Sequence, residues 1–416
     1  VVTATGTNSS IILSSMGYPA GVTVKVSDIK QGCTGTLSTD TCFGSLSAWE
    51  AAKQRDLVAA NEIEVAKIDG AWTAADTTSV YINGWTTDAT RYIKIYTTAA
   101  ARHQGKWDTT KYRLEITNGV GIQIDEDYAR IEGLQIQLTN NTTGSGRQGI
   151  NLPPTQGAVS DVRISHSIIR GVISGTTSGS DGISPGASSI NNVIKIWNNI
   201  VYDFYNQTTP TEAGHVAVGV GDGMVIAYNN TVFNSYIGIG SGSGSDALYL
   251  KNNLVQGDSQ NASFTDYVNV SATSSANNIS SDATSPDTAF RSKIVAFVDA
   301  TNKDFRLAAA DTAAKNAGAD LSADANLAVT TDVEGYLRPT GAGVVDIGAD
   351  EEGVTTIPSS SGTFESATMD FGASGVDFST LTWNPGSQPA GTNLYFDVAA
   401  NNDNATWNYL ALGDEA

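Results

Sequence analysis

The chain has 416 residues, of which 40% are hydrophobic and only 16% are charged, and its formal net charge is −20. This composition argues against a disordered chain and against a helical bundle, and the abundance of small, turn-forming residues indicates many short strands. The negative charge would repel nucleic-acid phosphates and anionic lipids, so neutral glycans, cations and other proteins are the expected partners.

Residues 1–42 are expected to form an N-terminal extension. The chain begins at Val1 rather than Met, which fits a secreted precursor without its signal segment, although a trimmed chain would begin in the same way. It contains no apolar run of about 18 residues, so no membrane-spanning helix is expected. The two cysteines, Cys33 and Cys42, flank a short polar loop, which favours a local disulfide over a pair of free thiols.

The run from Ser47 to Ala60 is the strongest helix signal, because alanine is frequent and Ser47 followed by Glu50 forms a capping box. Segments 63–68, 79–82 and 91–96 then alternate apolar and other residues with the period of a strand. The helix is therefore expected to cover the open apolar end of a stack of strands.

A pattern of two short strands joined at a polar corner recurs over about 128–256. Ser167, Asn199, Asn230 and Asn253 follow one another at intervals of 32, 31 and 23 residues, and Gly/Ser/Thr-rich inserts account for the longer intervals. Such an irregular repeat of β-branched strands predicts stacked parallel coils from about 115 to 285.

The corner of the repeat is marked by pairs of asparagines, Asn198 with Asn199, Asn229 with Asn230 and Asn252 with Asn253. Asparagine tolerates a left-handed backbone, and amides stacked in successive coils can hydrogen-bond to one another. These residues are therefore interpreted as structural.

The pattern gives the domain organisation. Residues 43–352 are expected to form an all-β parallel solenoid with an N-terminal cap, and 353–362 a Thr/Ser-rich linker. Residues 363–416 are expected to form a small β-sandwich-like segment, whose missing strands would lie beyond this sequence or come from another chain. Its expected strands lie near Phe364, Thr380, Tyr395 and Trp407.

Over roughly 43–352 the chain resembles the right-handed parallel β-helix proteins of microbial cell surfaces, including pectate-lyase-like solenoids. Besides the repeat, the resemblance rests on segments 82–90, 102–107 and 346–351 and on the motif Asp332-x-Glu334-Gly335-x-x-Arg338-Pro339. It implies a right-handed solenoid, secretion or display at a cell surface, and a trailing sandwich module. Enzymes that share this fold are mainly polysaccharide lyases and inverting glycoside hydrolases.

Three residues are weak catalytic candidates, Asp181, Lys195 and His215. An inverting hydrolase needs an acid and a base on opposite faces of the sugar, but the paired aspartates of the resembled hydrolases are absent. A lyase needs a cationic base such as Lys195. Asp181 is interpreted in preference as a turn residue, Lys195 as an outward strand residue, and His103 and His166 as structural.

Acidic clusters and glycosylation sequons give further candidates. Asp125, Glu126 and Asp127 offer oxygen ligands for Ca²⁺, as does the cluster 346–352, but a solvated acidic face is favoured. No other cofactor is expected. Sequons at Asn141, Asn206 and Asn261 become glycosylation sites only in a host with the machinery.

The leading hypothesis is a non-catalytic extracellular protein, acting as a surface-layer, filament or adhesin component whose partners are further copies or other surface proteins. A carbohydrate-active enzyme is the alternative. A glycan-binding module without turnover is a third hypothesis, and aromatic side chains stacked on one flank, drawn from Trp85, Trp107, Trp197 and Tyr228, would favour it.

Overall fold

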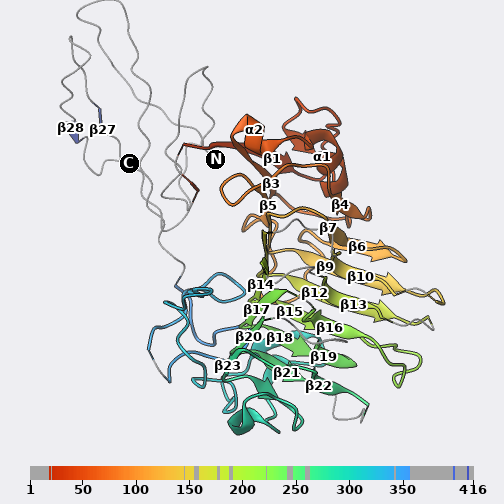
Figure 1. Ribbon diagram of the computed structural model, residues 1–416, viewed down its shortest axis with the longest axis vertical. Helices are drawn as coiled ribbons and strands as arrows, with labels where there is room; N and C mark the ends of the chain where they lie inside the picture. Colours follow the sequence, from red (N-terminus) through yellow and green to blue (C-terminus); the bar gives the residue numbers. More distant parts are fainter. Residues whose placement is uncertain are drawn as a thin grey trace, which may run out of the picture. The chain divides into compact units, whose positions relative to one another are not determined.

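The computed structural model describes Tyr18, Pro19, residues 21–356 except 145, 154–158, 176–178, 187–190, 222, 241–246, 258–262 and 342, and residues 397–398 and 410–411. The chain divides into two compact units, one of residues 21–360 and one of residues 1–20 with 361–416. The larger unit is a parallel β-helix, as predicted (Figure 1). None of its described helices has the length and apolar character needed to cross a membrane.

Three parallel sheets form the β-helix. Sheet 1 contains, in spatial order, β2 (Cys42–Phe43), β1 (Thr23–Ile29), β3 (Glu62–Ile68), β5 (Ile93–Thr97), β8 (Ala129–Glu132), β11 (Ser160–Ser165), β14 (Asn192–Trp197), β17 (Met224–Tyr228), β20 (Ala247–Lys251) and β23 (Ser274–Ala276). Sheet 2 contains β6 (Leu114–Thr117), β9 (Gln135–Asn140), β12 (Ile168–Ile173), β15 (Ile200–Tyr202), β18 (Thr231–Phe233), β21 (Leu254–Gln256) and β24 (Ile279–Ser280). Sheet 3 contains β4 (Val80–Ile82), β7 (Ile122–Ile124), β10 (Gln148–Leu152), β13 (Asp181–Pro185), β16 (Val216–Gly219), β19 (Ile237–Gly240) and β22 (Thr265–Val268).

From β5 onward the chain passes through sheets 1, 2 and 3 in turn, and each strand pairs in parallel with the equivalent strand of the next coil. Alternation places one set of side chains inside: in β14, Ile194 and Ile196 are buried, whereas Lys195 between them is partly exposed. Where sheets 2 and 3 meet, Gly182 leaves no room for a side chain, because a Cβ there would lie 2.7 Å from Val201 Cγ1. The inward side chains of successive coils form one continuous hydrophobic core, which is mainly aliphatic.

Two short helices close the N-terminal end, α1 (Leu46–Lys53) and α2 (Leu57–Ala60). The N-cap of α1 is Ser45, whose Oγ accepts the Ala48 N–H at 3.2 Å, so the predicted capping box beginning at Ser47 is wrong by two residues. Trp49 of α1 is fully buried in the core. The helices therefore shield the apolar end of the first coil, as expected.

The coils begin earlier than the predicted start near residue 115. β1, which lies within the predicted N-terminal extension, pairs in parallel with β3 over its whole length. The short strand β2 pairs with the other edge of β1. Cys33 and Cys42 are joined by a disulfide with an S–S distance of 2.01 Å, which links the loop after β1 to β2.

The corner between sheets 1 and 2 contains an inner row of stacked asparagines. Asn199 Nδ2 donates to Asn230 Oδ1 at 3.1 Å, Asn230 Nδ2 to Asn253 Oδ1 at 3.0 Å, and Asn253 Nδ2 to Asn278 Oδ1 at 2.8 Å. All four side chains are fully buried. The amide ladder expected from the repeat is therefore present, and Asn278 extends it by one coil.

The residue before each ladder asparagine has a left-handed backbone: φ is 53° at Asn198, 51° at Asn229, 54° at Asn252 and 57° at Asn277. The side chains of this outer row hold the C-terminal part of the β-helix unit. Asn198 Nδ2 donates to Thr331 O at 2.7 Å, Asn229 Nδ2 to Gly348 O at 3.3 Å, Asn252 Nδ2 to Ala319 O at 2.8 Å, and Asn277 Nδ2 to Ala317 O at 2.6 Å.

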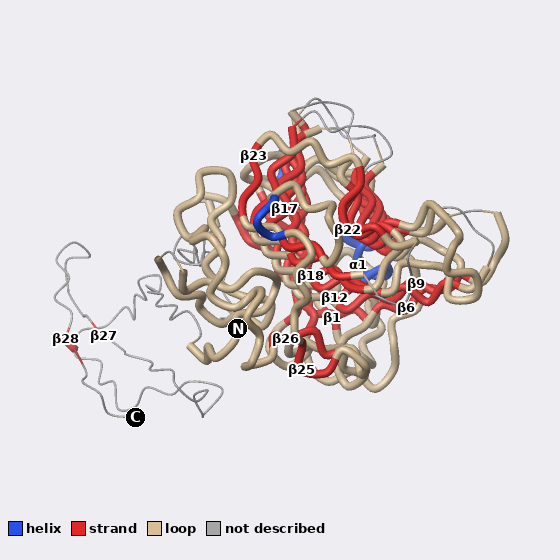
Figure 2. The backbone as a smooth tube through the Cα atoms, turned by 90° about the horizontal axis from the view of Figure 1, so that it is seen from below, coloured by secondary structure: helices blue, strands red, loops and turns tan. Residues whose placement is uncertain are grey.

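We call residues 297–351 the strap. It follows the 3₁₀ turn η2 (Thr288–Phe290) and begins with the antiparallel pair β25 (Phe297–Asp299) and β26 (Asp304–Leu307). Phe305 and Val333 of the strap pack against Ile168 and Ile200 on the outer face of sheet 2. Figures 1 and 2 show the strap along the outside of the later coils, with β25 and β26 outside sheet 2. The strap therefore covers the outer face of sheet 2 over β12, β15 and β18.

The smaller unit is described only at β27 (Asp397–Val398) and β28 (Leu410–Ala411), which form a short antiparallel pair. These two strands lie close in sequence to Tyr395 and Trp407, where two of the four strands are predicted, whereas the strands predicted near Phe364 and Thr380 lie outside the described residues.

Candidate functional site

Asp181 and His215 lie in neighbouring coils, where sheet 3 begins. Asp181 Oδ1 accepts the Val216 N–H at 3.2 Å, and His215 Nδ1 accepts the Ser180 N–H at 3.2 Å. Burial raises the pKa of Asp181 to about 7 and lowers the pKa of His215. His215 Nε2 is buried and has no hydrogen-bond partner among the described residues. Two of the three catalytic candidates are therefore neighbours in adjacent coils, although their own hydrogen bonds go to backbone N–H groups.

Lys195 is not part of this pair. It lies on the outer face of sheet 1, where strand register aligns four cations in a row, Lys94, Arg130, Arg163 and Lys195. Asp161 lies 3.3 Å from Lys195 Nζ and 2.7 Å from Arg163 Nη2. Lys195 therefore forms an ion pair with a neighbouring carboxylate on the outer face of the sheet, as expected of an outward strand residue.

The aromatic residues considered for sugar stacking do not form one exposed flank. Trp85 is 6% exposed beneath α1, where its Nε1 donates to Glu50 Oε1 at 3.2 Å, and Tyr228 is fully buried beside Leu321 of the strap. The guanidinium group of Arg170 stacks over the Trp107 ring at 3.8 Å. These aromatic side chains serve packing within the molecule.

His103 and His166 are structural. His103 Nε2 lies 2.9 Å from the His166 carbonyl oxygen, and His166 Nε2 lies 3.1 Å from Thr331 Oγ1 of the strap. Burial, together with the nearby Arg102, lowers the pKa of each histidine to about 3. Both histidines are therefore neutral near pH 7. Their hydrogen bonds join the corner between sheets 1 and 2 to the segment around His103 and to the strap.

The acidic run 125–127 does not converge on one point. Glu126 Oε1 accepts the Trp85 N–H at 2.8 Å, whereas Asp125 accepts from Gln123 Nε2 at 3.0 Å. Among the described residues, a set of three metal-ligand oxygens within 4.8 Å of one another is found elsewhere, at Asp332, Glu334 and Asp350. Two of the three weak Ca²⁺ candidates thus have hydrogen-bond partners within the first coils.

Glu126 gives the fold a testable pH dependence. Burial, and then the carboxylates of Asp127, Asp125 and Glu50, raise its pKa from 4.5 to about 7. Between these values the folded chain keeps a proton that the unfolded chain has released, so stability falls as the pH rises through this window. Glu126→Gln, which keeps the acceptor for Trp85, is expected to raise the Tm at pH 8 and leave it nearly unchanged at pH 4, as calorimetry can measure.

Asp88 provides a control of opposite sign. Its hydrogen bonds to Arg91 hold the pKa of this carboxyl well below its usual value of 3.8, so its stabilisation is present above about pH 4 and is lost as the pH falls further. Asp88→Asn should lower the Tm at pH 7 and have less effect at pH 2. A Glu126→Gln variant that is less stable than the native chain at pH 8 would contradict the assignment.

The carboxylate cluster of the strap was not predicted as a set. In the sequence, Asp332 and Glu334 belong to one motif, whereas Asp350 belongs to the acidic run 346–352. Burial, and then the like charges of Glu334 and Asp332, raise the pKa of Asp350 to about 8. The sequence does not indicate this cluster, because its members are separated along the chain. Only the folding of the strap brings the turn at Asp332 next to Asp350.

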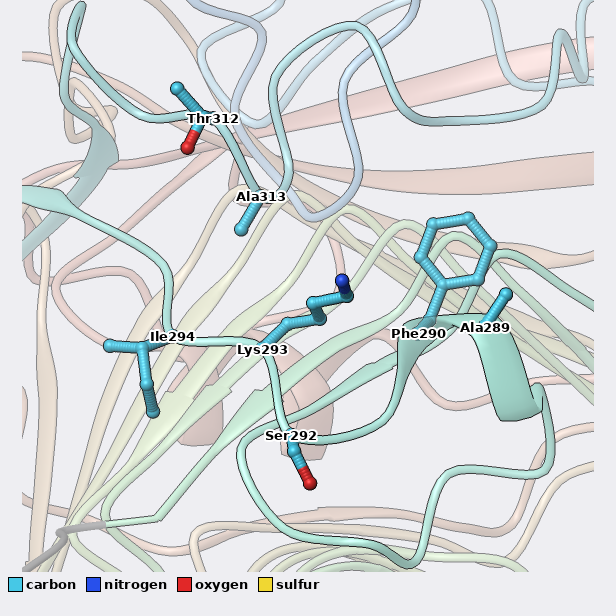
Figure 3. A pocket seen from close by; sticks show the side chains of 7 residues that line it. All are labelled: Ala289, Phe290, Ser292, Lys293, Ile294, Thr312 and Ala313. Carbon is cyan, nitrogen blue, oxygen red and sulfur yellow. The ribbon is translucent and has the colours of Figure 1, made fainter.

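A small hollow lies between η2 and a loop of the strap, with a volume of about 370 Å³. Figure 3 shows Phe290 and Lys293 on one side and Thr312 and Ala313 on the other. Lys293 is the one charged side chain in the lining, and no catalytic candidate contributes to it. The hollow therefore offers no acid and base pair.

The sequons differ in accessibility. Asn141 is exposed, whereas Asn206 is fully buried and its Nδ2 donates to Gly175 O at 2.7 Å and to Glu212. A glycan on Asn206 would need this amide to leave the fold. Asn261 lies outside the described residues.

Comparisons of the chain with protein-family models, curated proteins and solved structures found no match.

Proposed function

We propose that this protein is a secreted, non-catalytic structural or adhesive component of a cell surface, in which the β-helix serves as a rigid arm. The supporting observation is the double row of asparagines: the inner row joins the coils, and the outer row fastens the strap across them. Buried amide networks hold one arrangement of the backbone. The corner between sheets 1 and 2 is thus filled by structural bonds, which favours rigidity over a substrate groove.

The outer face of sheet 3 suits contact with another copy of the chain. Strand register aligns Tyr81, Gln123, Asn151 and Ser184 in one row of uncharged side chains, and Tyr81 is 45% exposed. Two copies that each carry a net charge of −20 repel one another, so a neutral row is the surface at which they approach with least electrostatic cost.

The test is to locate the protein in native cell envelopes by immunogold labelling and to image the purified full chain at high concentration. We expect surface label and ordered assemblies, which Ser184→Asp should weaken and the matched control Thr117→Asp on sheet 2 should not. Purely monomeric particles without surface label would contradict the proposal.

A carbohydrate-active enzyme is the second candidate, favoured by the positions of Asp181 and His215 in adjacent coils, where each side chain bonds to the backbone beside the other residue. A carboxyl with a pKa of about 7 matches the requirement for a general acid near neutral pH. Incubation with a panel of neutral and acidic polysaccharides, with and without Ca²⁺, tests it directly.

On this panel we expect no more product from the native chain than from Asp181→Asn or Lys195→Ala, measured as released reducing ends and as unsaturated sugars. Thermal unfolding must show that both variants are folded. Turnover by the native chain that either substitution abolishes would favour the enzyme over the structural protein.

A further inference from the structure

Three carboxylates of the strap meet at one point. Asp332 precedes a tight turn, Glu334 lies within that turn, and Asp350 lies near the end of the strap. One oxygen from each lies within 4.8 Å of one oxygen from each of the others. Asp350 also binds a third segment, because its Oδ2 accepts the Leu307 N–H of β26 at 2.7 Å.

Only one of the two carboxylate oxygens of Asp332 accepts hydrogen bonds from the described residues. Its Oδ1 accepts the N–H groups of Glu334, Gly335 and Tyr336 at 3.0, 2.9 and 2.8 Å. Its Oδ2 is buried and has no hydrogen-bond partner among the described residues. The side chain is fully buried, and a carboxylate oxygen in such surroundings requires a proton, a water molecule or a cation.

The two neighbouring arginines do not neutralise the negative charge of these three carboxylates. Arg306 Nη1 lies 3.7 Å from Glu334 Oε1, but its guanidinium group binds Asp304 more closely, at 2.9 and 2.7 Å. Arg338 Nη1 is 2.7 Å from Glu351 Oε2. Both arginines thus have closer carboxylate partners than the three that converge.

We propose that Asp332, Glu334 and Asp350 bind a Ca²⁺ ion, which fixes the turn, the end of the strap and β26 to one another. Three carboxylates without histidine or cysteine form a hard oxygen site, which suits Ca²⁺ and disfavours zinc or copper. Backbone carbonyls or water would supply the remaining ligands. The proposal is independent of whether the chain is a structural protein or an enzyme.

The test uses the full chain, freed of metal with a chelator and dialysed to pH 7.5, and CaCl₂ as the probe. Isothermal titration calorimetry should show one site lost in Glu334→Gln, with an affinity loss larger than the roughly 10–100-fold that follows removal of an outer-shell partner. CaCl₂ should raise the Tm of the native chain by several degrees and protect the strap from limited proteolysis. The matched control Glu126→Gln should keep both responses.

Three results would overturn the site. A native chain that binds no Ca²⁺ and shows no Tm shift would mean that the carboxylates share protons instead. A response that persists in Glu334→Gln, or one that disappears in Glu126→Gln, would place the ion elsewhere. If Glu334→Gln does not fold, calcium protection of peptide bonds at 332–336 in the native chain decides between the outcomes.

Discussion

Replacing Asn230 by alanine is expected to lower the free energy of unfolding by at least about 3 kcal/mol, because each buried polar group left unpaired costs about 1–3 kcal/mol. Asn230 Oδ1 accepts both the backbone N–H and Nδ2 of Asn199, at 3.1 Å each. Its Nδ2 donates to Ile196 O at 2.9 Å. Alanine therefore breaks the amide ladder in both directions, and urea denaturation measures the loss.

Two further variants make this prediction specific to the ladder. Asn230→Asp keeps the acceptor but places a carboxylate against the Ile196 and Tyr228 carbonyls, so it should be less stable than Asn230→Ala at pH 7. Asn302→Ala, on the exposed surface, should lower the stability by less than about 0.5 kcal/mol. Equal effects at positions 230 and 302 would show that the ladder contributes little.

Replacing Arg338 by alanine is expected to cost about 3–5 kcal/mol, the usual effect of removing one partner from a buried ion pair. Arg338 and Glu351 are 3% and 2% exposed. The guanidinium group also donates to Gly348 O at 2.8 Å and to Ala349 O at 2.9 Å. Denaturation should show the loss, and proteolysis should cut the strap sooner than in the native chain.

Arg338→Lys should restore little, because a lysine cannot reproduce the fork of bonds to several oxygens. Arg338→Met combined with Glu351→Gln should be more stable than Arg338→Ala, since no unpaired buried charge remains. Arg291→Ala is the surface control, because Arg291 is exposed. An Arg338→Ala variant with native stability and protease resistance would contradict the role given to this pair.

The fold was predictable where the signal is local. Alternating apolar residues in 63–68 and 91–96 correctly predict β3 and β5. The asparagine pairs correctly predict the corner, because the left-handed backbone and the stacked amides involve only residues of one coil and the next. The N-cap at Ser45 was missed because Ser47 and Glu50 match the same short pattern, while Glu50 instead accepts hydrogen bonds from Gln54 and Trp85.

The candidate site was less predictable, because its contacts join distant residues. The residues around each pair do not indicate that its first asparagine binds the strap. Asn198, for example, donates to the carbonyl oxygen of Thr331, which lies more than a hundred positions later in the chain. The meeting of Asp350 with Asp332 and Glu334 has the same origin. The placement of His215 beside Asp181 depends on the pairing of β13 with β16, which lies 35 positions further along the chain.

The outer asparagine row has a mechanical consequence. The strap is bonded to four successive coils through Asn198, Asn229, Asn252 and Asn277, so it crosses the boundaries at which these coils would part under tension. A pull along the stack must break the strap's bonds together with those between strands, and the load is shared by two parallel paths. The strap therefore reinforces these four coils against extension along the axis of the stack.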